Sequence, residues 1–130
     1  MKISIVTVTY NSANTIACTI ESVLKQKYED YEYIVVDGGS KDATVDIIKE
    51  WEPKFNGRMR WISEKDKGMY DGINKGIRMS TGDVVGIINS DDFYHREDIF
   101  QIINDTFKAH KGIEAIYGDV RFVNPNNLNK

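Results

Sequence analysis

Two adjacent carboxylates that directly follow an apolar run are the part of this sequence best suited to chemistry. Residues 84–88 are apolar or small, as is typical of a strand buried on both faces, and Asn89-Ser90-Asp91-Asp92 comes next. Two ionised carboxylates about 4 Å apart repel each other by about 4 kcal/mol at an effective dielectric constant near 20. A bound Mg²⁺ or Mn²⁺ would relieve this repulsion, because both cations prefer oxygen ligands and commonly share them with substrate phosphates. The alternative is that Ser90 or Asp91 starts a turn and caps the next helix.

Polar residues also follow three other segments that are predicted to be strands, over residues 3–8, 33–36 and 59–62. The four polar segments at strand ends are Thr9-Tyr10-Asn11, Asp37, residues 63–66, and Asp91-Asp92. In a parallel sheet, ligands bind beyond the carboxyl ends of the strands, where the strand order reverses. We therefore expect these four segments to form one site.

Apolar residues at helical spacing predict the elements that position this site. The predicted helices cover residues 16–27, 45–51, 69–79 and 99–107, and a further short strand is expected over residues 115–117. Gly72 and Gly76 each cost a helix roughly 1 kcal/mol relative to alanine, so they indicate a closely approached backbone or a short, irregular helix. Strands that alternate with helices predict right-handed βαβ units, hence an α/β fold with a mostly parallel sheet flanked by helices.

Length and composition indicate a single soluble domain in a reducing compartment. The 130 residues carry a formal charge of −3, which gives no reason to expect nucleic-acid binding. The one cysteine, Cys18, cannot form an internal disulfide, and we expect it to be buried in a helix. No apolar run reaches the roughly 18 residues of a membrane span, and no signal-peptide layout is visible. We expect a cytoplasmic protein that could still associate peripherally with the inner face of the cytoplasmic membrane; its oligomeric state is left open.

Four motifs, in order and spacing, resemble the amino-terminal, nucleotide-sugar-binding half of a family 2 glycosyltransferase with the GT-A fold. The motifs are Thr7-Val8-Thr9-Tyr10-Asn11, residues 36–42, residues 66–76, and Thr81-Gly82-Asp83 leading into Asn89-Ser90-Asp91-Asp92. Residues 64–76 are also similar to a branch that makes bacterial surface polysaccharides. The resemblance implies a binding domain over residues 1–123. Residues 124–130 are then a polar tail or the start of a missing acceptor-side segment, so we expect a truncated chain.

The same resemblance implies roles for individual residues. Thr9, Tyr10 and Asn11 would line the nucleotide, with Tyr10 along the base, and Asp37 would accept a hydrogen bond from a base N–H and so select uracil over cytosine. Asp91 and Asp92 would hold the Mn²⁺ or Mg²⁺ ion, and Asp91 also the ribose or diphosphate. The further nucleotide-sugar contacts would be Lys67, Asp71 and Asn74. The structural alternatives are a strand-end aromatic for Tyr10, a turn residue for Asp37, and an exposed helix surface for the last group.

Three positions depart from the family pattern. Gly38 stands at the second acidic position after the second strand, which removes one contact to the base or ribose. Ile73 stands where an arginine is common, so either Lys67 or Lys75 compensates for its charge or the pocket is built differently. Asn89 replaces the first acid of the metal motif and would bind a cation less strongly than a carboxylate.

The implied activity is metal-dependent inverting transfer of a hexosyl or N-acetylhexosaminyl group. The donor would be a nucleotide-diphosphate sugar, with UDP the expected nucleotide, and the acceptor a hydroxyl of a saccharide or a lipid-linked acceptor. Inversion needs a general base, for which Asp119 is a weak candidate. Two alternatives remain: a donor-binding fragment without transfer activity, and a sugar nucleotidyltransferase. The second alternative requires a glycine-rich basic loop after the first strand, and residues 9–14 contain neither glycine nor lysine.

Overall fold

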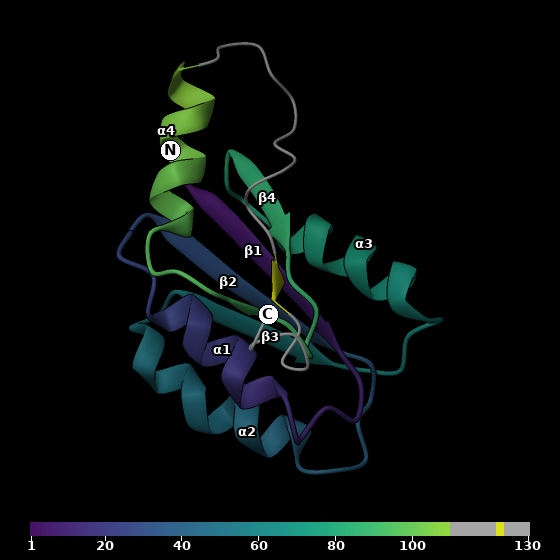
Figure 1. Cartoon of the computed structure of the whole chain (residues 1–130). Helices are drawn as coiled ribbons and strands as arrows, with labels where there is room; N and C mark the ends of the chain where they lie inside the picture. The colour runs from purple at the N-terminus through teal and green to yellow at the C-terminus, as the bar shows by residue number, and fades with distance from the viewer. Residues whose placement is uncertain (110–121, 124–130) are drawn as a thin grey trace.

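A four-stranded parallel sheet forms the centre of the protein. In the computed structural model, which describes residues 1–109 and 122–123, the strand order is β3-β2-β1-β4 (Figure 1). The strands are β1 (Ile3–Thr9), β2 (Tyr31–Asp37), β3 (Met59–Ser63) and β4 (Val84–Ile87). A small antiparallel pair joins β5 (Phe93–Tyr94) to β6 (Phe122–Val123). The predicted α/β fold with a parallel sheet is confirmed.

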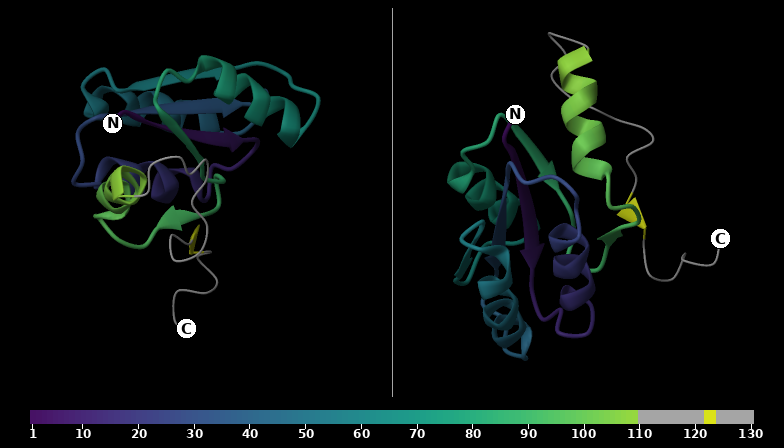
Figure 2. Two further views of the ribbon diagram at one scale, coloured as in Figure 1. Left: turned by 90° about the horizontal axis from the view of Figure 1, so that it is seen from above. Right: turned by 90° about the vertical axis from the view of Figure 1, so that its left-hand side faces the viewer.

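Helices cover both faces of this sheet. They are α1 (Ile16–Leu24), α2 (Thr44–Trp51), α3 (Met69–Met79) and α4 (Ile99–Ala109), and a short 3₁₀ helix, η1 (Glu52–Phe55), follows α2. α1 and α2 lie on one face and α3 on the other (Figures 1 and 2). α1 ends at Leu24, three residues before the predicted end at Lys27.

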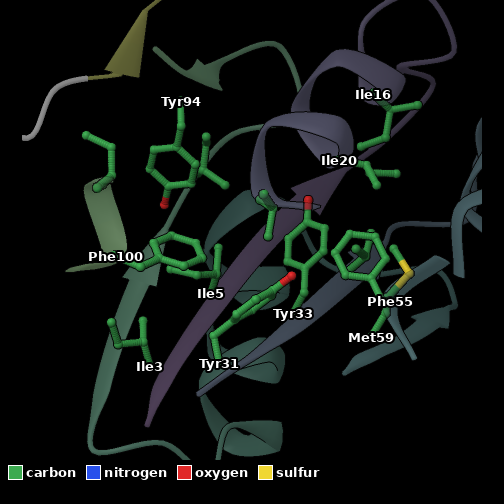
Figure 3. Close-up of a cluster of buried hydrophobic side chains, with 14 of the residues drawn as sticks. Ile3, Ile5, Ile16, Ile20, Tyr31, Tyr33, Phe55, Met59, Tyr94 and Phe100 are labelled. Carbon is green, nitrogen blue, oxygen red and sulfur yellow. The ribbon is translucent and has the colours of Figure 1, made fainter. Parts of the chain in front are cut away.

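The alternation of side chains along β1 divides the core into two parts. Ile3 and Ile5 point toward α1 and α2, into the larger cluster, which includes Tyr33 and Phe100 (Figure 3). Val6 points to the opposite face, where a smaller cluster contains Ile34 and Val36. The two clusters differ in composition, because the first contains several aromatic rings and the second contains only aliphatic side chains and Met79.

α3 packs unusually close to β1, and this explains its two internal glycines. A Cβ atom on Gly76 would lie 2.3 Å from Val6 Cγ1, and one on Gly72 would lie 2.7 Å from Val8 Cγ1. Real Cβ atoms do not approach other atoms so closely. The first of the two explanations predicted from the sequence, a closely approached backbone, is therefore confirmed for this helix of 11 residues.

Two expectations about burial are wrong. Residues 84–87 are not buried on both faces, since β4 pairs only with β1 among the described strands and Val85 is 38% exposed. Cys18 is exposed because it lies on the side of α1 that faces away from the sheet. The expected strand at residues 115–117 lies outside the described residues. No helix within the described part of the chain is long and apolar enough to cross a membrane.

Candidate functional site

A pocket of about 810 Å³ lies at the carboxyl edge of the parallel sheet. The strand register places Thr9 beside Asp37, and Asp37 beside Ser63, so the connections that follow three strands start at the same level. The connections after all four strands contribute to the pocket, and its lining includes Thr9, Tyr10, Gly38, Lys41, Lys65, Asp66, Asn89 and Asp91. The connections after the four strands thus meet at one pocket, as expected, but Asn11, Asp37 and Asp92 do not line it.

Thr9 and Tyr10 give the middle of the pocket one polar and one flat apolar contact. The Tyr10 side chain is 56% exposed and lines the pocket at the end of β1. Thr9 is 2% exposed, and its hydroxyl has no hydrogen-bond partner among the described residues. A buried hydroxyl without a partner is uncommon, so a ligand in this pocket could supply the bond that the protein does not.

Asp37 lies beneath the pocket and does not line it. Its carboxylate is fully buried and accepts hydrogen bonds from the backbone N–H groups of Gly39 and Ser40, at 3.1 and 2.8 Å. The hydroxyls of Ser40 and Ser63 also donate to it, the latter at 2.7 Å. Asp37 therefore holds the turn after β2 and ties it to the end of β3.

Asn11 connects the first two loops of the site. It adopts the left-handed backbone conformation at a φ of 49°, and its side-chain Oδ1 accepts a hydrogen bond from the Lys41 backbone at 2.8 Å. Its own backbone N–H donates to Ser40 Oγ at 2.7 Å. Asn11 is thus a brace between the connections after β1 and β2, and it does not line the pocket.

The acidic segment after β4 forms a turn that is anchored to α1. The Asp92 N–H donates to the Asn89 carbonyl at 3.1 Å, and Thr19 Oγ1 contacts the carbonyls of Ser90, at 3.0 Å, and Asp92. The next helix begins only at Ile99, so neither Ser90 nor Asp91 caps it. The turn alternative holds in part, and the helix-cap alternative does not.

The two carboxylates of this turn differ in position. Asp91 is exposed and lines the pocket, whereas Asp92 is half-buried. Burial raises the pKa of Asp92 above its usual value, the charge of Asp91 raises it further, and a hydrogen bond from the Asn89 side chain opposes both effects. The turn therefore concentrates negative charge that a cation would neutralise.

The donor set suits a hard divalent cation that is shared with a ligand. Within residues 1–109, no three His, Cys, Asp or Glu side chains form a group that could hold a metal by themselves. Asp91 and Asp92 supply carboxylate oxygens, and Asn89 adds an amide oxygen at the same turn. Mg²⁺ is usually bound by one or two carboxylates, with substrate phosphates and water completing its coordination. The residues present fit that type of site.

The predicted contacts at the start of α3 lie outside the pocket. The Asp71 carboxylate accepts a hydrogen bond from the Lys67 backbone at 3.0 Å and pairs with Lys75 at 3.4 Å. The Lys67 N–H lowers the pKa of Asp71, as do the hydrogen bond and charge of Lys75. Asn74 is exposed on α3. Lys67, Asp71 and Asn74 are thus not among the residues that line the pocket.

Residues 63–66 were expected at the site as a segment, but three charged pocket residues received no individual role from the sequence: Lys41, Lys65 and Asp66. Lys67 and Lys75 were expected to replace the charge of the absent arginine, but Lys75 pairs with Glu64 and Asp71, and Lys67 does not line the pocket. Lys41 and Lys65 are the lysines that do. Their position next to Asp37-Gly38-Gly39 and Asp66 was the signal that could have identified them.

The sequence and the fold both have relatives with known names. Residues 4–128 match the model of the family "Glycosyl transferase family 2". A "PGL/p-HBAD biosynthesis glycosyltransferase" of Mycobacterium bovis (strain BCG / Pasteur 1173P2) is 31% identical over 117 residues, which are 90% of this chain and 46% of that protein. An "uncharacterized glycosyltransferase" of Mycobacterium tuberculosis is 36% identical over 89% of this chain and 44% of its own length. The chain thus spans about half the length of these curated relatives.

Solved structures of glycosyltransferases share the fold. S. aureus TarS 1-349 in complex with UDP-GlcNAc superimposes with a TM-score of 0.76 at 23% identity, over 90% of this chain and 37% of TarS 1-349. The mannosyltransferase PcManGT from Pyrobaculum calidifontis, in complex with GDP-Man and Mn²⁺, gives a TM-score of 0.70 at 25% identity, over 75% of this chain and 30% of its own. The expected GT-A fold is confirmed. With a family match over nearly all of its residues, the chain belongs to glycosyltransferase family 2.

Proposed function

We propose that this chain binds the nucleotide-sugar donor of a metal-dependent, inverting glycosyltransferase, and that the donor is a UDP-sugar. The observation that carries the proposal is the pocket itself, which brings the exposed ring of Tyr10 together with Asp91, the neighbour of Asp92, at one edge of a GT-A sheet. The proposed reaction transfers the sugar to a hydroxyl of a saccharide or of a lipid-linked acceptor.

The strand order suggests how the nucleotide lies. The acidic turn follows β4 at one edge of the sheet, and Asp66 follows β3 at the other. Neighbouring strands are about 4.8 Å apart, so three spacings separate these ends by roughly 14 Å. We place the diphosphate and its cation near Asp91 and Asp92, the ribose across the ends of β1 and β2, and the base between Tyr10 and the connections after β2 and β3.

Several side chains support this orientation. The hydroxyl of Thr9 has no partner within residues 1–109, so it could bond to a ligand group at the end of β1. Lys41 and Lys65 line the pocket and bring positive charge toward a diphosphate. Asp37 and Asn11 contribute by holding the loops in place. Lys67, Asp71 and Asn74 remain predicted sugar contacts; they do not line the pocket, although Gly68 and Met69 at the start of α3 do.

The protein's own groups have three tasks in this reaction. The pocket fixes the donor so that the face of the anomeric carbon opposite the diphosphate stays open to the acceptor. Asp91 and Asp92 would hold the cation, which when bound would supply Lewis-acid stabilisation of the negative charge on the leaving diphosphate. A carboxylate must also remove the proton of the attacking hydroxyl. Asp119 is our candidate for this base, and it lies outside the described residues.

Calorimetric titration with UDP, with and without Mn²⁺, tests the proposal on the wild-type chain and on the variants Asp91→Ala and Asp92→Ala. We expect UDP binding to depend on Mn²⁺ and to weaken by 10-fold or more in both variants, since each removes a charged ligand. Glu50→Gln, on the exposed surface of α2, is the matched control and should bind UDP like the wild type.

Three results would separate the alternatives. Binding of UDP that is independent of Mn²⁺ and equal in all variants would refute the metal assignment. Release of UDP from a UDP-sugar when an acceptor saccharide is added would show that the chain is active by itself. Tight binding without any release would support the donor-binding alternative, in which the chain holds the donor but does not transfer its sugar.

A further inference from the structure

The carboxylate of Asp66 occupies a niche that two glycines leave open. A Cβ atom on Gly38 would lie 3.0 Å from Asp66 Oδ2, and one on Gly72 would lie 3.2 Å from the same oxygen. Both glycines are buried, whereas Asp66 is half-buried and lines the pocket. The side chain of Asp66, from the connection after β3, thus lies where a side chain at position 38, after β2, would extend.

The hydrogen bonds of Asp66 leave one of its oxygens available. Oδ1 accepts a bond from the Gly68 N–H at 3.1 Å, which orients the carboxylate at the start of α3. Oδ2 accepts no hydrogen bond from any residue in the described part of the chain. Asp37 is the opposite case, because both of its oxygens are already engaged by the turn after β2 and by Ser63.

We infer that Asp66 is the residue that selects the base of the donor, and that it favours uracil over cytosine through Oδ2. The inference rests on the proposed function, and it assigns to Asp66 the role that the family resemblance had given to Asp37. It also accounts for Gly38: the second acidic residue after β2 is absent, and a carboxylate from the next loop fills its place.

The chemistry of the two bases makes the selection possible. Uracil carries an N–H between two carbonyls at its pairing edge and can donate that hydrogen to a carboxylate. Cytosine has a bare ring nitrogen at the same position, which would face the lone pairs of Oδ2. A site that is built to accept a hydrogen bond rejects an analogue that cannot donate it, because the buried polar group is then left unpaired. Hydrogen bonds to charged groups typically change affinity by roughly 10- to 100-fold.

Competition between UDP and CDP, measured by calorimetry in the presence of Mn²⁺, tests the inference on the full chain. We expect the wild type to bind UDP at least 10-fold more tightly than CDP. In Asp66→Asn the amide can either accept or donate a hydrogen bond, so UDP should bind more weakly, CDP more tightly, and the ratio should approach one. Glu64→Gln removes a nearby carboxylate that pairs with Lys75 outside the pocket, and it should retain the wild-type ratio.

A transfer of the carboxylate to position 38 provides the sharper test. Asp66→Ala should abolish the preference for UDP, and the double variant Gly38→Asp/Asp66→Ala should restore it, because an aspartate at position 38 would reach the vacated niche. Gly38→Asp alone should weaken binding of both nucleotides, since its side chain would collide with Asp66. Circular dichroism of each variant checks that the fold is kept.

The outcomes distinguish this inference from the function on which it depends. If Asp66→Asn keeps the wild-type ratio while Asp91→Ala still weakens UDP binding, the base-selecting role of Asp66 is overturned and the proposed function stands. Tighter binding of GDP than of UDP by the wild type would also overturn the uracil assignment. If the wild type binds neither UDP nor CDP, both the inference and the proposed function fail.

Discussion

Asp92 occupies a position that disfavours its own charge. Its surroundings, together with the neighbouring charge of Asp91, raise its pKa, and one hydrogen bond from Asn89 compensates only in part. Removing the charge would therefore help the free protein to fold. A carboxylate that destabilises the free chain and suits a cation is an example of stability that is given up for binding.

The first prediction concerns the effect of the Asp92 charge on stability and on ligand binding. Asp92→Asn should raise the melting temperature of the metal-free chain by about 2–5 °C, because it removes a partly buried charge and its repulsion by Asp91. Asp91 is exposed, so the repulsion is closer to the value of about 1 kcal/mol in water than to that at a dielectric constant of about 20. The same variant should lose the additional stabilisation that wild type gains from UDP with Mn²⁺. Differential scanning calorimetry with and without these ligands measures both effects. Asp30→Asn, an exposed carboxylate near the start of β2, is the control, and an equal rise in that variant would contradict the prediction.

Residue types and spacing predicted the location of the site better than they predicted the contacts. Thr9, Tyr10 and Asp91 were identified because each follows a predicted strand, and strand ends meet at one edge of a sheet. The difference between Asp37 and Asp66 could not be read in the same way. The difference between the two residues lies in the hydrogen bonds that each carboxylate accepts from its own loop. Those bonds depend on the directions of the side chains, which residue spacing does not specify.

At the scale of elements, α1 positions the acidic turn through a row of buried polar side chains. Thr19, Ser22 and Gln26 lie three and four residues apart and therefore share one side of the helix. Thr19 contacts the carbonyls of Ser90 and Asp92, Ser22 Oγ accepts the Tyr94 N–H at 3.0 Å, and Gln26 accepts the Phe100 N–H at 3.2 Å. These polar side chains thus supply hydrogen-bond partners to backbone groups between Ser90 and Phe100, a segment that has little regular secondary structure.

The second prediction tests this support. Thr19→Val keeps the shape of the side chain but leaves the carbonyls of Ser90 and Asp92 without their donor, so it should lower the free energy of unfolding by about 1–2 kcal/mol. Affinity for UDP with Mn²⁺ should fall several-fold because the acidic turn loosens, whereas Thr19→Ser should retain most of it. Urea denaturation and calorimetry measure the two effects.

Thr106→Val serves as the matched control for Thr19→Val. Its hydroxyl bonds to the Ile102 carbonyl within α4, at 2.8 Å, and does not reach the acidic turn. Thr106→Val should therefore leave nucleotide affinity unchanged. A loss of affinity in this variant equal to that of Thr19→Val would show that the effect is a general consequence of lower stability.

Hydrophobic periodicity located the elements but not the polar row. The apolar residues Ile16, Ile20 and Val23 predicted that α1 packs on the sheet, and all three are fully buried. Thr19 and Gln26 are polar, so the sequence alone suggests that they face solvent. Their burial could not be predicted because their hydrogen-bond partners are backbone atoms about 70 residues further along the chain. The glycines of α3 were more informative, since their cost within a helix already indicated a close neighbour.

At the scale of the whole molecule, Glu32 joins parts of the fold that are far from the pocket. Glu32 is 6% exposed on β2 and accepts hydrogen bonds from Ser4 on β1, at 2.5 Å, and from the Thr81 N–H before β4, at 2.5 Å. Arg60 on β3 pairs with it at 2.7 Å. Burial raises the pKa of Glu32, but the hydrogen bonds from Ser4, Thr81 and Arg60 outweigh that effect and lower the pKa to about 2.

The third prediction follows from this lowered pKa. Because the fold binds the ionised form more tightly, Glu32 should contribute its full stabilisation, on the order of 2 kcal/mol, above its ordinary pKa of 4.5 and lose it as the pH falls toward 2. Glu32→Gln should therefore be less stable than wild type at pH 7, and its stability should fall less between pH 5 and pH 2. Urea denaturation across this pH range measures the difference. Parallel pH profiles for wild type and variant would contradict the assignment.

The pocket is assembled from four segments that are spread along the chain from residue 8 to residue 91, and this has a consequence for how binding depends on correct folding. The pocket lies at the ends of β1, β2, β3 and β4, so under our proposal a bound nucleotide would contact connections that all four strands position. A misfolded chain in which one of these strands is displaced would therefore not bind the donor nucleotide. Under our proposal, nucleotide binding thus distinguishes correctly folded molecules from misfolded ones.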